Sequence, residues 1–154
     1  MSKPKAKRQD LLDPIQGPVF TVRFVLALLL MIGGIAWIAY YYLAVRADPA
    51  VVDAKAGGPA FMADLGGWNY VIGFGALMLG LIVSAHPTTP LGRGRGVAPT
   101  MLTCFLVGLV WICTFYVFSN DLSQVPVMDD LGQKNLLVGI AFMAVGFAFA
   151  THWE

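Results

Sequence analysis

Two histidines are the residues of this chain best suited to binding a metal ion or a haem. His86 and His152 lie 66 residues apart, each at the end of an apolar stretch. Neutral imidazole is a common ligand of both groups. It is also a favourable residue at a helix C-terminus, where partial positive charge suits the helix dipole. Two ligands alone do not define a metal site, so we favour the second role and predict no metal and no cofactor.

The two cysteines are predicted to be packing residues. Cys104 and Cys113 are nine positions apart in one apolar stretch. At about 100° per residue this spacing places them on opposite faces of a helix. Neither lies in a redox or nucleophile motif. The chain holds no CxxC, GxSxG, HExxH or phosphate-loop motif, so we predict no catalytic residue and no enzyme.

Basic residues gather in two short segments. In the segment 92–96, glycines alternate with Arg93 and Arg95. No strand precedes this segment, so a flexible turn beside anionic headgroups is favoured over nucleotide binding. The same headgroup contact is predicted for the basic residues of the N-terminal tail, which are Lys3, Lys5, Lys7 and Arg8. The tail could also dock onto a cytoplasmic protein.

The elements that position these groups are four long apolar stretches. The chain is 58% hydrophobic and only 12% charged, which excludes an ordinary soluble domain. About 20 helical residues span a hydrocarbon core of about 30 Å. We therefore predict an all-α integral membrane protein with four transmembrane helices, over residues 22–45, 68–86, 98–118 and 134–151. No Asp, Glu, Lys or Arg lies in their interiors, which disfavours a pump, a transporter or an exporter.

The distribution of basic residues predicts the orientation in the membrane. Of the ten Lys and Arg residues, seven precede the first helix interior or lie between the second and third helices. Cytoplasmic loops carry an excess of such residues. Both termini and the segment 87–97 are therefore expected on the cytoplasmic side of the plasma membrane. The first apolar stretch exceeds the roughly 7–15 residues of a signal-peptide core, so we expect an uncleaved helix.

The second half of the chain repeats the first. Residues 128–152 match residues 62–86 at an offset of 66, and Gly34, Trp37, Ile38 and Tyr42 match Gly108, Trp111, Ile112 and Tyr116 at an offset of 74. Because a unit of two helices returns the chain to the side on which it started, both copies enter the membrane with the same orientation. We predict a tail over 1–21, a transmembrane hairpin over 22–86, a linker over 87–97 and a second, diverged hairpin over 98–154.

Glycines recur every seven residues in both copies. They are Gly66, Gly73 and Gly80 in the first copy and Gly132, Gly139 and Gly146 in the second. Stripes of small residues let helices approach closely, and such packing is a main source of helix association in lipid. Packing inside the bundle is favoured over a groove for a partner protein.

Three features of the first copy carry a resemblance to a known family. They are the basic start Lys3–Arg8, the dipeptide Gly17-Pro18, and the stretch Leu65-Gly66-Gly67-Trp68-Asn69-Tyr70 that opens the second helix. Together they resemble the CrgA family of actinobacterial cell-division membrane proteins. The resemblance covers residues 3–86, and residues 98–152 look like a diverged copy. In that copy Gln133, Lys134 and Leu136 replace Gly67, Trp68 and Tyr70.

The resemblance implies a non-enzymatic adaptor that coordinates cell division and septal peptidoglycan synthesis through lateral contacts with other integral membrane proteins. It suggests a partner-binding segment composed of Trp68, Asn69, Tyr70, Gly66, Gly73 and Gly80. The alternative is an accessory structural subunit of a large membrane complex, such as a respiratory cytochrome oxidase supercomplex. Neither nucleic acid nor a small-molecule substrate is expected. The family has a single copy, so the second hairpin could take the place of a dimer partner.

Overall fold

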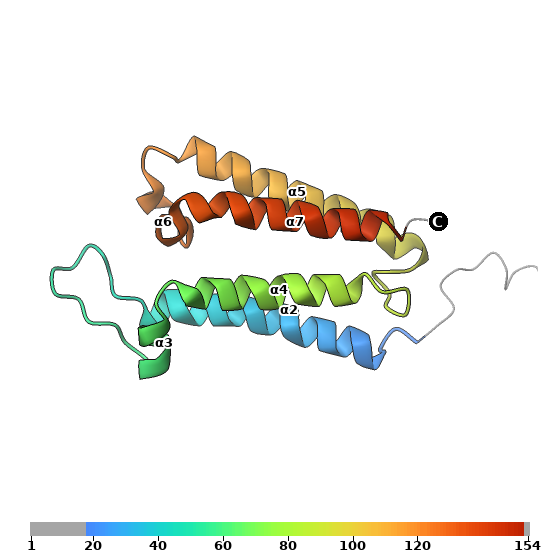
Figure 1. Ribbon diagram of the computed structural model, residues 1–154, viewed down its shortest axis with the longest axis horizontal. Helices are drawn as coiled ribbons and strands as arrows, with labels where there is room; N and C mark the ends of the chain where they lie inside the picture. Colours follow the sequence, from blue (N-terminus) through green and yellow to red (C-terminus); the bar gives the residue numbers. More distant parts are fainter. Residues whose placement is uncertain (1–17, 153–154) are drawn as a thin grey trace, which may run out of the picture.

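The computed structural model describes residues 18–152, and these residues form helices and connecting turns without any strand (Figure 1). The four long helices are α2 (Val22–Tyr40), α4 (Trp68–Ser84), α5 (Val97–Val117) and α7 (Asn135–Ala150). The short elements are η1 (Tyr41–Val45), α3 (Ala60–Leu65), η2 (Gly94–Gly96), η3 (Leu122–Gln124), α6 (Met128–Leu131) and η4 (Gly132–Lys134). The basic-tail residues Lys3, Lys5, Lys7 and Arg8 lie outside the described residues.

The helices begin and end within two residues of the predicted positions, when η1 is counted as the continuation of α2. Local hydrogen bonds cap the start of α2 and satisfy polar side chains within α5. The Thr21 hydroxyl oxygen accepts a bond from the backbone N–H of Phe24 at 3.2 Å and so caps α2. The hydroxyls of Thr100, Thr103 and Thr114 donate to the carbonyl four residues earlier. These bonds satisfy polar groups that the hydrocarbon core could not solvate.

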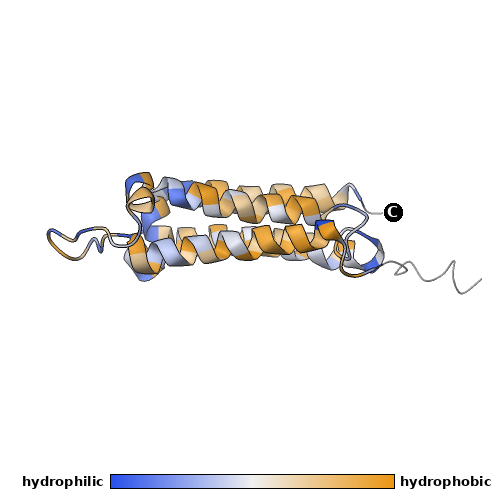
Figure 2. Ribbon diagram, turned by 90° about the horizontal axis from the view of Figure 1, so that it is seen from below, coloured by the Kyte–Doolittle hydropathy of each residue, from blue (hydrophilic) through white to orange (hydrophobic). Residues whose placement is uncertain are grey.

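The outer faces of the bundle are apolar, and Figure 2 shows hydrophobic residues along the length of the helices. Leu29, Leu137 and Phe147 are each about two-thirds exposed, at 65%, 67% and 65%. Three helical segments are long and apolar enough to cross a membrane, Val22–Val45, Gly94–Val117 and Met128–Ala150. The apolar helix α4 is shorter, at 17 residues. Apolar residues on both the inside and the outside identify a membrane protein rather than a soluble bundle.

Two helical hairpins make up the bundle. Helix α2 packs along α4, α5 packs along α7, and the two hairpins meet mainly where α4 lies beside α7 (Figure 1). Close packing inside each hairpin depends on glycine. A Cβ added to Gly34 would lie 2.5 Å from the carbonyl oxygen of Gly73, and one added to Gly108 would lie 2.6 Å from that of Gly139. The two hairpins therefore pack their helices in the same way.

The predicted role of the glycine stripe is confirmed in part. Gly73 and Gly80 lie against α2, and a Cβ on either would overlap Ile38 or Met31. The prediction is wrong for Gly66 and its counterpart Gly132. A Cβ on either would meet no atom within 4 Å, and their φ angles are +49° and +50°. They are glycines because the turn needs a positive φ, rather than because a helix packs on them.

Candidate interaction site

The segment that opens α4 is a hydrogen-bonded turn built around one asparagine. Gly66 ends α3 with φ +49° and ψ −127°. The Asn69 side-chain N–H groups donate to the carbonyls of Met62 and Gly66 at 2.7 and 2.8 Å. Its amide oxygen accepts from Trp37 Nε1 at 3.2 Å, so α2 is tied to the same turn. Asn69 is fully buried, and both the nitrogen and the oxygen of its side-chain amide form hydrogen bonds.

The segment that opens α7 has the same backbone but lacks one of these bonds. Gly132 has φ +50° and ψ −127°, and Asn135 donates to the carbonyls of Met128 and Gly132 at 2.9 and 2.7 Å. Its amide oxygen is buried without a hydrogen bond, as is Nε1 of Trp111, the residue equivalent to Trp37. The Trp111 ring instead packs edge-on against Phe74 of the first hairpin, with 5.6 Å between centroids.

Polar side chains join the two hairpins at the end of the bundle where α4 and α7 begin. Arg46, which follows η1, contacts the carboxylates of Asp129 and Asp130 at 2.8 and 3.1 Å. The Tyr70 hydroxyl donates to Asp130 at 2.5 Å. The Arg46 guanidinium also lies 4.5 Å from the ring centre of Tyr42. Burial opposes the charge of Arg46, but Tyr42 and the two carboxylates outweigh that cost and raise its pKa. We call these five residues the polar clasp.

The residues predicted to bind a partner occupy different environments. Trp68 is 67% exposed on the outside of α4. Asn69 and Tyr70 are buried by contacts within the chain, and Gly73 and Gly80 are buried against α2. Of this group, only Trp68 presents a large side chain to the surroundings. Binding of a partner by the segment stays a prediction.

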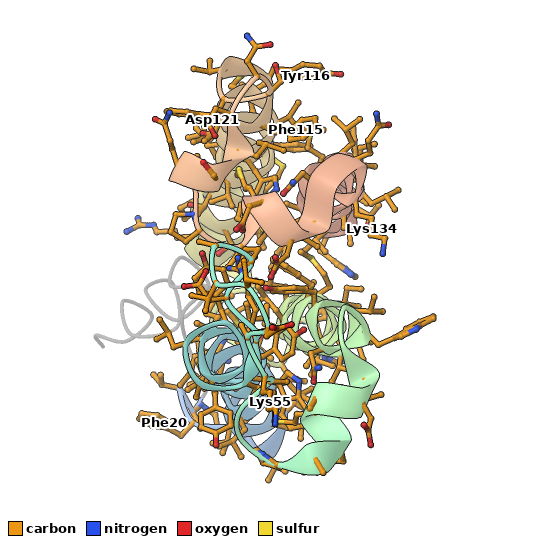
Figure 3. All side chains as sticks on the ribbon, turned by 90° about the vertical axis from the view of Figure 1, so that its left-hand side faces the viewer. Phe20, Lys55, Phe115, Tyr116, Asp121 and Lys134 are labelled. Atoms are coloured by element: carbon orange, nitrogen blue, oxygen red, sulfur yellow. The ribbon has the colours of Figure 1, made fainter. Side chains whose placement is uncertain are left out.

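A groove of about 300 Å³ runs between α4 and α7, and we call it the α4/α7 groove. Its mouth, near the start of both helices, is flanked by Gly67 and Lys134. Further along, Val71 and Gly75 of α4 and Ala141 of α7 line it. Figure 3 looks onto this end of the bundle and shows Lys134 at the side where α7 adjoins α4. The groove is therefore polar at one end and apolar along its length.

The opposite end of the bundle carries Arg23, Arg93 and Arg95. The Arg23 guanidinium contacts the imidazole of His86, with 2.6 Å between Nη1 and Nε2. Arg93 donates to the carbonyl of Pro18 at 3.4 Å. Arg95 lies in η2 beside it. Three arginines and one histidine thus lie close to where the chain enters α2 and leaves α4. Contact of Arg93 and Arg95 with lipid headgroups stays a prediction.

The connection between the hairpins is compactly folded rather than an open glycine-rich turn. Thr89 is fully buried, and its hydroxyl lies against the carbonyls of Ser84 and His86. A Cβ on Gly92 would overlap the His86 carbonyl, and one on Gly96 would overlap that of Pro90. Glycine is needed here because backbone segments pass close together. The sequence predicted a flexible turn over 92–96, but close packing of the backbone is what requires glycine at Gly92 and Gly96.

The groups that could do chemistry are separated from one another. Cys104 is buried, as predicted for a packing residue, whereas Cys113 is exposed, so that prediction is wrong for Cys113. His86 pairs with Arg23, while His152 is exposed after α7. Within residues 18–152, no three His, Cys, Asp or Glu side chains lie close enough to hold a metal ion.

The polar clasp was not predicted from the sequence. A usable signal was present, because Asp129 and Asp130 lie shortly before the last helix and Arg46 directly follows the segment predicted as the first. All three residues then lie at the same end of the bundle. Nothing in the order of residues says which of several acids at that end meets the arginine.

Comparison with known proteins settles the family. The profile of a family described as "Cell division protein CrgA" matches this chain twice, over residues 2–86 and over residues 89–154. The chain belongs to the CrgA family. The resemblance that the sequence suggested for the first copy is confirmed, and the second segment matches the same family in its own right.

Individual CrgA proteins are similar over part of the chain. One from Streptomyces avermitilis is 45% identical over 64 residues, which are 42% of this chain and 71% of that protein. One from Corynebacterium glutamicum is 43% identical over 54 residues, which are 35% of this chain and 48% of that protein. Both are named cell division proteins, which supports a role in cell division for this chain. No solved structure matches it.

Proposed function

We propose that this protein is a non-enzymatic adaptor of the division machinery, which links other integral membrane proteins through lateral helix contacts. The double match to the CrgA family carries the proposal. The polar clasp supports it, because Arg46, Asp129 and Asp130 join one hairpin to the other, and the outer helix faces left for lateral contacts are apolar. Coordination of septal peptidoglycan synthesis is the process in which we expect the adaptor to act, as the family resemblance implies.

The adaptor is proposed to cross the membrane four times as two tandem hairpins, with both termini in the cytoplasm. The 17 residues of α4 reach the lower limit of about 17–25 residues for a spanning helix. The equal turns at Gly66 and Gly132 support an origin by duplication. Arg23, Arg93 and Arg95 favour the cytoplasmic side for the end that carries them.

Trp68 is the proposed point of contact with a partner. Its neighbours in the predicted segment, Asn69 and Tyr70, are buried and help to hold Trp68 in position. Asn69 fixes the turn from which α4 begins, and Tyr70 ties that turn to Asp130. A large exposed aromatic side chain beside such a rigid turn is typical of an interface anchor. Headgroup contacts by Arg93 and Arg95 would hold the opposite end at the membrane surface.

We expect Trp68→Ala to weaken recovery of division proteins about tenfold or more, because truncation of an anchor tryptophan removes much of the binding energy. The measurement is affinity purification of the full chain in mild detergent, with mass spectrometry of the eluate. A fluorescent fusion would show reduced septal localisation in parallel. The matched control is Tyr116→Ala, which removes another exposed aromatic side chain, 61% exposed, from the second hairpin.

Two results would contradict this function. Equal recovery of division proteins by Trp68→Ala and the unaltered chain would remove Trp68 from the interface. Recovery of cytochromes and oxidase subunits, without any division protein, would favour the accessory-subunit alternative instead.

A further inference from the structure

The α4/α7 groove is left open by small residues that the bundle does not need for its own packing. A Cβ added to Gly75 would meet no atom within 4 Å, whereas Gly73 on the same helix is pressed against α2. Ala141, which lines the opposite wall, is the residue equivalent to Gly75 at the offset of 66. The two copies therefore place a glycine and an alanine at equivalent positions, and the space between them stays unfilled by the chain itself.

The size of the groove matches one hydrocarbon chain. From Gly67 to Met78, the lining residues of α4 cover eleven helical steps, or about 16 Å. This length equals about half of a hydrocarbon core of about 30 Å, which is the depth of one leaflet. A partner helix about 10 Å wide would fill about 1,200 Å³ over that length, which is more than the groove can hold. A helix could lie over the groove but not inside it.

The charge at the mouth of the groove favours an anionic headgroup. Lys134 is exposed there and forms no ion pair within the described residues. The carboxylate of Asp130, which also borders the groove, is already engaged by Arg46 and by the Tyr70 hydroxyl. Lys134 is therefore the basic group among the residues that line the groove, and no carboxylate of the described residues pairs with it. Trp68 lies beside the mouth and exposes an indole, a side chain suited to the headgroup level.

We propose that the α4/α7 groove binds one anionic phospholipid. One acyl chain would lie along Val71, Gly75 and Ala141, and the phosphate would lie beside Lys134. The site is at the opposite end of the bundle from Arg93 and Arg95, so it is distinct from the predicted headgroup contacts there. The inference does not depend on the adaptor function or on its partners.

The test is native mass spectrometry of the full chain, purified in mild detergent and mixed with palmitoyl-oleoyl phosphatidylglycerol or phosphatidylcholine. The unaltered chain is expected to retain one phosphatidylglycerol molecule in preference to phosphatidylcholine. Ala141→Leu fills the groove and should reduce the bound fraction about fivefold or more. Ala144→Leu makes the same change at an exposed position of α7 outside the groove and should bind like the unaltered chain.

The charge is tested separately. Lys134→Gln should keep the acyl chain bound but reduce the preference for phosphatidylglycerol over phosphatidylcholine about fivefold. Gly75→Leu fills the groove from the other wall, so it replaces Ala141→Leu if that variant loses its helical circular dichroism. Unchanged lipid retention in a folded groove-filling variant would overturn the proposal. Equal loss in Ala144→Leu, or an undiminished preference in Lys134→Gln, would overturn it too.

Discussion

Asn69 and Asn135 build the same turn, yet only the first has a full set of hydrogen bonds. In the first hairpin the indole N–H of Trp37 reaches the asparagine oxygen at 3.2 Å. In the second, Trp111 packs against Phe74 across the hairpin interface, and both polar groups are left unpaired. A buried polar group without a partner costs about 1–3 kcal/mol. Contact between the hairpins is thus gained at the expense of a bond within one of them.

This difference predicts unequal losses of stability for one substitution at two equivalent positions. Trp37→Phe removes the bond to Asn69 and should lower the free energy of unfolding by about 1–3 kcal/mol. Trp111→Phe keeps a ring that can pack on Phe74 and removes an unpaired N–H, so its loss should be at least about 1 kcal/mol smaller. Thermal unfolding followed by circular dichroism in detergent would measure both changes. Equal losses would mean that Trp111 also forms a bond in solution.

At the scale of the helices, the hydrophobic pattern was sufficient to predict the four long helices but not the short helical turns between them. Charge-free stretches and their length located all four helices, since those properties depend on local sequence alone. The role of Gly66 could not be predicted in that way. Its seven-residue spacing from Gly73 suggested one packing stripe, but a turn that needs positive φ and a helix that needs close approach both select glycine. Only the fold separates the two reasons.

Adjacent glycines on α2 give a test of close packing within the hairpin. A Cβ on Gly34 would lie 2.5 Å from the Gly73 carbonyl oxygen and 2.8 Å from the Leu77 nitrogen, and neither backbone atom can move without shifting α4. We expect Gly34→Ala to lower the free energy of unfolding by about 1–3 kcal/mol.

Gly33→Ala is the matched control, since a Cβ there would meet nothing within 4 Å. It should leave stability unchanged or raise it by about 0.5–1 kcal/mol, because alanine restricts the unfolded chain. Unfolding in detergent with increasing dodecyl sulfate would compare the two variants. The close approach of α2 and α4 would be refuted by similar midpoints for both.

At the scale of the whole molecule, the two hairpins have diverged in the parts they bring to the polar clasp. Arg46 and Tyr70 come from the first hairpin, and the carboxylates come from the second. The second hairpin has Leu136 where the first has Tyr70. Two identical hairpins could each supply the arginine and tyrosine to the carboxylates of the other. Here the first hairpin supplies them and the second supplies the carboxylates. This asymmetry fits a chain in which one copy has taken the place of a partner.

The equivalent acids Asp130 and Asp64 test whether the clasp holds the hairpins together. Asp130 accepts the Tyr70 hydroxyl and pairs with Arg46, whereas Asp64 is exposed and forms no ion pair within the described residues. Asp130→Asn weakens two charge-assisted bonds and should cost about 1.5–3 kcal/mol of docking energy.

Spin labels on exposed sites of α2 and α5 should then report a longer and broader distance distribution by electron paramagnetic resonance. Asp64→Asn makes the same chemical change outside the clasp and should leave that distribution unaltered. If both variants or neither broadened it, docking would depend on the apolar contact between α4 and α7 rather than on the clasp.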